Sequence, residues 1–142
     1  MIVEIPGLVE GAHIGKGLGY EFLRHVERTK LLIYLLEGTS STLDGDFIKL
    51  NEELSLYKAN LCQKPKMIAI TKVDLPQVKD RLHDIRQALD FLKLPVFFIS
   101  AVSGEGVLQF TIKAIEMAGQ AGQEQKTDLS PAVAIFRPRP KR

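Results

Sequence analysis

The sequence predicts an α/β protein in which a mostly parallel β-sheet is flanked by helices. Short apolar runs of strand length alternate with longer segments whose apolar residues recur every three or four positions. This alternation is typical of parallel strands joined by right-handed helical crossovers. Polar or glycine-containing motifs follow the expected strands, and open sheets of this kind bind ligands at the carboxyl ends of their strands. We therefore expect a site along that edge of the sheet.

The four expected strands differ in character. Residues 1–5 alternate weakly between apolar and polar side chains. Residues 31–36 form a continuous apolar run, as expected of a parallel strand that is covered on both faces. Residues 66–70 and 96–99 are two further apolar runs of strand length.

Each expected strand is followed by a segment with helical spacing. The first segment covers residues 20–30 and the second begins at Phe47. The third segment follows Pro76 and the fourth follows Gly106. Apolar steps of three and four fit a helix that packs on a sheet. The apolar positions that mark these helices are Phe22, Leu23 and Val26; Phe47, Leu50, Leu54, Tyr57 and Leu61; Leu82, Ile85, Leu89 and Leu92; and Leu108, Ile112 and Ile115.

Composition restricts the class of protein. A chain of 142 residues with 45% hydrophobic and 25% charged residues is expected to be globular, with one domain over residues 1–119. The single cysteine, Cys62, excludes a disulfide framework and a thiolate zinc site. No apolar run approaches the roughly 20 residues that span a bilayer, and no signal-peptide pattern is present. We therefore expect a cytoplasmic protein without a membrane partner.

The positive net charge of +2 comes from the end of the chain. The last six residues contain four basic side chains, which leaves 15 basic and 17 acidic residues in the rest. Residues 120–142 are therefore expected to form a polar and basic linker or tail. A nucleic-acid surface would need basic side chains clustered on the body of the fold, so we expect no direct DNA binding.

A glycine-rich segment follows the first strand. After Glu4, a Pro6–Gly7 turn begins a stretch with five glycines in thirteen residues. Glycine allows the backbone to approach a ligand closely, and an acidic residue beside such a loop suits a site that senses a metal-bound phosphate. The alternative from these features alone is a flexible surface loop.

The order of residues in this segment resembles the third GTPase box and second switch of the Obg (CgtA) family of bacterial GTPases. The matching positions are Pro6, Gly7, Gly11, Ala12, Gly15, Gly17, Leu18, Gly19, Phe22, Leu23, Arg24, His25, Glu27, Arg28 and Thr29. The resemblance implies that Glu4, which replaces the family's aspartate, holds Mg²⁺ through water, and that the Gly7 N–H meets the γ-phosphate. Leu8 stands where Ras-type GTPases have a water-orienting glutamine, so hydrolysis would need another group.

Residues 71–75 follow the third strand and resemble the Asn-Lys-x-Asp box that selects guanine, with Thr71 in place of asparagine. A carboxylate at Asp74 can accept hydrogen bonds from the ring N–H and the amino group of guanine. Adenine would leave that carboxylate unpaired, at a cost of about 1–3 kcal/mol. The Lys72 stem can pack along the base. The alternative is a strand end followed by a structural turn.

Residues 100–106 follow the fourth strand and resemble the fifth GTPase box. In that box a backbone N–H near Ala101 meets the guanine carbonyl oxygen, while Ser100 braces the turn and orients Asp74. The nucleotide-binding residues that the resemblance implies are Glu4, Ile5, Pro6, Gly7, Thr71, Lys72, Val73, Asp74, Ser100, Ala101 and Val102, with Glu4 also as the metal ligand.

The phosphate-loop motif, Gly-x-x-x-x-Gly-Lys-Ser/Thr, does not occur in the sequence. The resemblance therefore implies a partial P-loop NTPase-like G domain that lacks the first strand and the phosphate loop. In the family's sheet that strand lies between those matching residues 1–5 and 31–36. We expect residues 1–5 either to shift and pair with residues 31–36 or to be poorly ordered.

Our first hypothesis is a partial Obg-type GTP-binding protein with GTP or GDP and Mg²⁺ as weakly bound ligands. The resemblance implies a role in assembling the large ribosomal subunit. Without a phosphate loop, we expect weak or undetectable GTP binding and no hydrolysis by this chain alone. The second hypothesis is a nucleotide-free module that binds the ribosome or a protein partner.

Overall fold

A computed structural model describes residues 2–6, 27–57, 63–124 and 133–137 of the chain, with side chains described within residues 27–55 and 63–120. These residues form a five-stranded, fully parallel sheet in the order β1-β5-β2-β3-β4. The strands are β1 (Ile2–Pro6), β2 (Leu31–Glu37), β3 (Lys66–Thr71), β4 (Val96–Phe98) and β5 (Val133–Arg137). The helices are α2 (Leu43–Tyr57), α3 (Pro76–Lys79), α4 (Leu82–Leu89) and α5 (Val107–Glu124), with a short 3₁₀ helix, η3, at Asp90–Leu92. The predicted α/β class and parallel sheet are confirmed.

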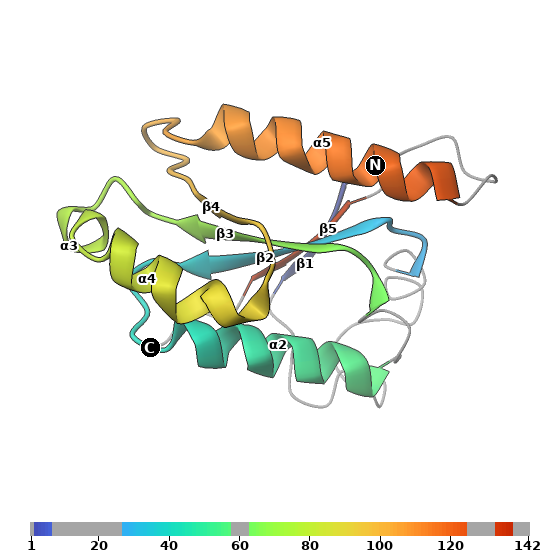
Figure 1. The fold of residues 1–142 in the computed structure, drawn as a ribbon, viewed down its shortest axis with the longest axis horizontal. Coiled ribbons are helices and arrows are strands. Elements are labelled where there is room, and N and C mark those ends of the chain that lie inside the picture. The colour runs from blue at the N-terminus through green and yellow to red at the C-terminus, as the bar shows by residue number, and fades with distance from the viewer. Residues whose placement is uncertain (1, 7–26, 58–62, 125–132, 138–142) are drawn as a thin grey trace.

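The sheet is covered on both faces, with α5 on one side and α2 and α4 on the other (Figure 1). Successive side chains of a strand point to opposite faces, so the continuous apolar run of β2 supplies both cores. Leu32, Tyr34 and Leu36 face α2 and α4, whereas Leu31 and Ile33 belong to the cluster beneath α5. This double coverage explains why β2 carries no polar residue before its last position.

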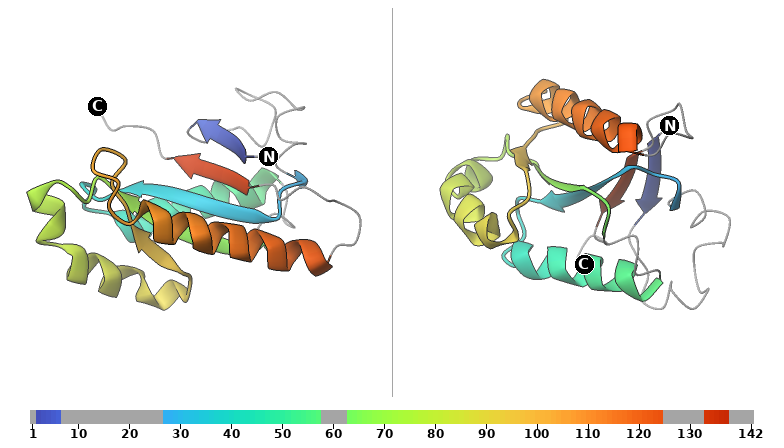
Figure 2. Two further views of the ribbon diagram at one scale, coloured as in Figure 1. Left: turned by 90° about the horizontal axis from the view of Figure 1, so that it is seen from above. Right: turned by 45° about the vertical axis from the view of Figure 1, so that its right-hand side comes forward.

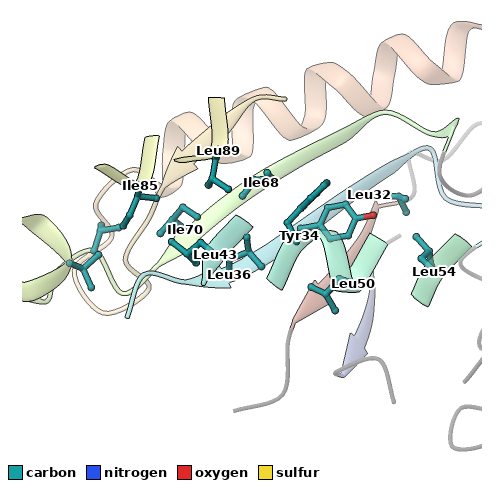
Figure 3. Packing of buried hydrophobic residues seen from close by; sticks show 13 residues of the cluster. Leu32, Tyr34, Leu36, Leu43, Leu50, Leu54, Ile68, Ile70, Ile85 and Leu89 are labelled. Carbon is teal, nitrogen blue, oxygen red and sulfur yellow. The ribbon is translucent and has the colours of Figure 1, made fainter. Parts of the chain in front are cut away.

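The larger core lies between the sheet and α2 (Figure 3). Tyr34 is fully buried there, with its ring edge against Phe47 at a centroid distance of 4.7 Å. Its hydroxyl donates to Asn51 Oδ1 at 3.0 Å, so the one polar atom that this tyrosine brings into the core is satisfied. The helix begins at Leu43, four residues earlier than Phe47, because Thr42 and Asp46 pair through their side chains at 3.1 Å across its first turn.

The last helix, α5, packs on the sheet with a different face from the one that Leu108, Ile112 and Ile115 mark. Leu108, Ile112 and Ile115 are 67%, 57% and 64% exposed, whereas Ala114 and Ala118 are buried against the sheet. Small side chains let the helix approach the strands closely, with Val107, Phe110 and Met117 packed around them. The helix therefore leaves an apolar stripe facing outward.

The fifth strand occupies the position between β1 and β2 that the sequence analysis leaves open (Figure 2). β5 pairs with β1 from Ile2↔Val133 to Pro6↔Arg137, and with β2 from Leu31↔Val133 to Tyr34↔Phe136. The expectation that residues 1–5 either pair with residues 31–36 or lack order is therefore wrong. The segment Val-Ala-Ile-Phe-Arg has strong β-propensity, and its insertion satisfies backbone groups on two strand edges that would otherwise be unpaired.

This strand also changes the description of the carboxyl-terminal segment. The sequence analysis assigns residues 120–142 to a linker or tail, whereas α5 continues to Glu124 and residues 133–137 lie inside the sheet. The helix expected over residues 20–30, apart from its last residues, lies outside the described part of the chain. The glycine-rich segment and Cys62 lie outside it as well.

We predict that Ile135→Pro destabilises the protein. Each residue within a strand that is paired on both sides donates its N–H to one neighbour, and proline has no N–H. Loss of this hydrogen bond should lower the free energy of unfolding by about 1–3 kcal/mol in a urea titration. The control, Ile135→Val, keeps the N–H and should lose less than about 1.5 kcal/mol. Equal stability of the two variants would contradict the placement of β5 in the sheet.

The turn before α5 yields a second prediction. Gly104 and Gly106 both have positive φ angles, 81° and 73°, which disfavour any residue with a Cβ. A Cβ at Gly106 would lie 2.1 Å from the Phe98 carbonyl oxygen, whereas a Cβ at Gly104 would meet no atom within 4 Å. Gly104→Ala should therefore cost about 1–2 kcal/mol of unfolding free energy, and Gly106→Ala clearly more. The opposite order in urea unfolding would disprove this geometry.

Candidate functional site

Two turns meet at the carboxyl edge of the sheet, one after β3 and one after β4. The strands pair in parallel from Ile68↔Val96 to Ile70↔Phe98, so both end on the same side. Beyond the strands the pairing continues, because Ile99 N–H donates to Ile70 O at 2.8 Å and Val73 N–H donates to Ile99 O at 3.3 Å. The sequence analysis predicts this proximity of residues 71–75 and 100–106, and the structure confirms it.

Asp74 and Ser100 are joined directly. Ser100 is fully buried, and its hydroxyl donates to Asp74 Oδ1 at 2.8 Å. The same Ser100 oxygen accepts from the Ser103 N–H at 3.1 Å, and the Ser100 backbone pairs with Glu105 O and Gly104 N–H at 2.9 and 2.8 Å. The serine thus fixes both the shape of its own turn and the direction of the carboxylate. Among the described residues, Oδ2 of Asp74 accepts no hydrogen bond, so one carboxylate oxygen remains available.

The turn after β3 alternates between inward and outward side chains. Val73 is buried, whereas Lys72 is exposed and Asp74 is partly exposed. Lys72 has a φ of 63°, a left-handed conformation that is uncommon for residues other than glycine. Its ammonium lies 3.2 Å from Glu37 Oε1, a carboxylate at the end of β2. The buried valine anchors the turn, while its two charged neighbours contact Glu37 and Ser100.

The turn after β4 contains exposed residues whose backbone N–H groups have no acceptor within the described residues. Ala101 and Val102 are exposed, with Val102 at 89%. Within the described ranges, neither of their N–H groups donates a hydrogen bond. These N–H groups lie one and two residues after the serine that holds Asp74. The two turns together therefore offer one carboxylate oxygen as an acceptor and backbone N–H groups as donors.

A third segment, the loop after β2, packs against the same turn. The Gly38 N–H donates to Thr71 O at 3.0 Å, and the Arg81 guanidinium donates to Gly38 O and Ser40 O, each at 3.2 Å. The motifs in the sequence do not indicate Glu37, Gly38 or Arg81. Glu37 is the one charged residue in its strand, which is the available sequence signal, whereas nothing near Arg81 in the sequence points to a loop 41 residues away.

The residues expected to contact phosphate and metal lie on a separate strand. Glu4, Ile5 and Pro6 belong to β1, and Gly7 falls outside the described residues. Because all strands are parallel, β1 ends at the same edge, but β5 and β2 separate it from β3, a spacing of about 14 Å between strand axes. In the described part of the chain, no three His, Cys, Asp or Glu residues form a cluster that could hold a metal ion. No described helix is long and apolar enough to cross a membrane.

The chain was compared with protein-family models and with curated proteins. No family model matches it. GTPase Obg of Dehalococcoides mccartyi strain BAV1 is 44% identical over 143 aligned residues, which cover 99% of this chain and 34% of that protein. GTPase Obg of Caldicellulosiruptor bescii is 38% identical over 96% of the chain, and that of Alkaliphilus oremlandii is 46% identical over 75%.

The chain spans about a third of the length of these curated relatives. The match extends along the boxes at residues 71–75 and 100–106 and along the strands that bring them together. The sequence similarity to these Obg proteins agrees with the observed parallel α/β sheet, which places the two turns at one edge. The chain belongs to the Obg family of GTPases, as a sequence that corresponds to about one third of a family member.

Proposed function

We propose that this chain is the guanine-recognising part of an Obg-type GTP-binding protein. The observation that carries the proposal is the 2.8 Å hydrogen bond from Ser100 to Asp74, which joins the two turns of the candidate site. It directs one carboxylate oxygen into a hydrogen bond with the protein and leaves the other for a ligand. The Ala101 N–H lies next to this pair.

This arrangement complements guanine rather than adenine. Guanine presents a ring N–H and an amino group beside a carbonyl oxygen, so it can donate to Asp74 while its carbonyl accepts from Ala101 or Val102. Adenine places a ring acceptor and an amino group at the equivalent positions, which opposes acceptor to acceptor and donor to donor. A buried or half-buried polar group left unpaired costs about 1–3 kcal/mol, which is sufficient for discrimination.

The base contacts alone set a modest affinity. Hydrogen bonds to a charged group contribute about 1.5–3 kcal/mol each, and about 4 kcal/mol corresponds to a millimolar dissociation constant. Lys72 adds contact through its stem, whereas the chain contains no Gly-x-x-x-x-Gly-Lys-Ser/Thr motif to bind phosphates. We therefore propose weak binding of GTP and GDP by this chain alone, without hydrolysis.

Residues 4–7 are proposed to contribute the metal and γ-phosphate contacts. A carboxylate such as Glu4 is the oxygen ligand that Mg²⁺ prefers, commonly through bound water. Glutamate is one methylene longer than the aspartate of the family motif, so its carboxylate lies one bond further from the backbone. A phosphate loop from elsewhere would be needed to place the nucleotide against these residues.

For the cell, the Obg resemblance supports a cytoplasmic protein that acts with guanine nucleotides in assembling the large ribosomal subunit. A second candidate function is a nucleotide-free module that binds the ribosome or a protein. The specific observation that favours it is the exposed apolar stripe of α5, formed by Leu108, Ile112 and Ile115. Retained partner binding by a chain with no nucleotide affinity would support this second function.

The proposal predicts that binding depends on Asp74. In calorimetric titrations with Mg²⁺, the unaltered chain should bind GTP more tightly than ATP, and Asp74→Ala should abolish the difference. Asp74→Asn replaces one acceptor by an amide donor and should shift the preference toward xanthosine triphosphate, whose base carries a carbonyl in place of the amino group. Asp84→Asn, an exposed position on α4, is the matched control and should behave as the unaltered chain. Equal GTP preference in the unaltered chain and Asp74→Ala would refute guanine recognition.

Ser100→Ala should weaken both stability and discrimination. It removes the donor to Asp74 and the acceptor of the Ser103 N–H in a fully buried position. The expected loss of unfolding free energy is about 1–3 kcal/mol. Ser103→Ala, in the same turn but exposed, removes only the acceptor of the Glu105 N–H at 3.3 Å and should cost less, about 0.5–1 kcal/mol, because water can replace that acceptor. A Ser100→Ala protein with unchanged stability and unchanged GTP-to-ATP preference would contradict the role assigned to this serine.

A further inference from the structure

The conformation of Lys72 requires support from outside its own turn. Its φ of 63° lies in the left-handed region, which residues with a Cβ rarely adopt. The lysine side chain is exposed, so packing does not fix its direction. Such backbone conformations persist where neighbouring structure determines them, and they occur often at binding sites. The contacts of Lys72 therefore indicate which neighbouring groups support its conformation.

Glu37 is the group in contact with the lysine ammonium. Glu37 is the last residue of β2 and pairs in register with Thr71, the residue before Lys72. Its Oε1 lies 3.2 Å from Lys72 Nζ, and the two side chains are 43% and 52% exposed. The lysine thus pairs with a carboxylate on the neighbouring strand, although Asp74 lies two residues away in its own turn. Among the described residues, Asp74 takes part in no ion pair.

The backbone that carries Glu37 is held firmly. Gly38 donates to Thr71 O at 3.0 Å, and Arg81 donates to the carbonyl oxygens of Gly38 and Ser40, each at 3.2 Å. A Cβ at Gly38 would lie 2.5 Å from Val78 Cγ1 and 3.0 Å from Thr71 O, so the two loops pack without space between them. The backbone of Glu37 therefore has a fixed position beside the turn, and from there its side chain reaches Lys72.

We propose that Glu37 is a positioning residue for guanine recognition, which holds the Lys72 ammonium away from Asp74. This inference rests on the proposed function of Asp74. Lys72 and Asp74 are opposite charges in one short turn, and an ion pair between them would occupy the oxygen that guanine needs. Glu37 offers the ammonium another partner on the neighbouring strand, so the carboxylate of Asp74 stays available.

The first test uses the nucleotide-free chain. Glu37→Gln keeps the shape of the side chain and removes its charge, so Lys72 should turn toward Asp74. In ¹H–¹⁵N NMR spectra, the amide signals of Lys72, Val73 and Asp74 should move. The matched control is Glu116→Gln on α5, which removes a similar exposed pair with Lys113 at 3.4 Å. Amide signals of the turn that are unaffected by Glu37→Gln would overturn the proposal.

The second test measures selectivity. Glu37→Gln should weaken GTP binding about two- to fivefold, the range expected of an exposed ion pair, and leave ATP binding unchanged. Glu116→Gln should have no effect. In a Lys72→Ala background, Glu37→Gln should cause no further loss of GTP binding, because no ammonium remains to compete for Asp74. If Glu37 had only a structural role, Glu37→Gln would weaken the binding of both GTP and ATP, and the same loss would occur in the Lys72→Ala background. That result would overturn the proposal.

The two hypotheses fail in different ways. If the unaltered chain binds GTP and ATP alike, guanine recognition by Asp74 is refuted, and the role of Glu37 in it is refuted too. If the unaltered chain prefers GTP while Glu37→Gln and Glu116→Gln both retain the full preference, guanine recognition stands and the role of Glu37 is refuted.

Discussion

The parallel pairing of β3 with β4 determines where the chemistry of this chain lies. Because the two strands run in the same direction, the turns that follow them emerge at one edge, and the hydrogen bonds of Val73 and Ile99 extend the pairing beyond the strands. Ser100 then connects the turns through Asp74. The contact between Asp74 and Ser100 depends on this pairing, since the two residues lie in separate turns 26 residues apart in the sequence.

The centre of the sheet illustrates that an unfilled strand position is energetically unfavourable. Two parallel strands with an empty position between them would leave donors and acceptors unpaired on both edges. In this structure β5, the last strand in the sequence, takes that position and pairs with β1 and β2. The candidate site at the ends of β3 and β4 lies on the other side of β2 from this strand.

The sequence predicts the features that depend on local patterns. The strands β2, β3 and β4 follow from apolar runs, and the contact between Asp74 and Ser100 follows from a motif at the end of two of them. The position of β5 could not be predicted, because it depends on an unpaired edge far away in the sequence rather than on its own residues. Glu37 and Arg81 were missed for the same reason, since their roles arise from contacts between separate loops. The outward stripe of α5 shows that helical spacing alone does not decide which face packs.

The central claim is that the edge formed by Asp74 and Ala101 binds a guanine base. The most direct measurement is an NMR titration of the chain with GMP and, separately, with AMP, which contain the base without a triphosphate. We predict that GMP at millimolar concentration shifts the amide signals of Ala101 and Val102 together with those of the turn at residues 72–74, and that AMP does not. Equal shifts with both nucleotides, or GMP-dependent shifts confined to another part of the sheet, would contradict guanine recognition at this site.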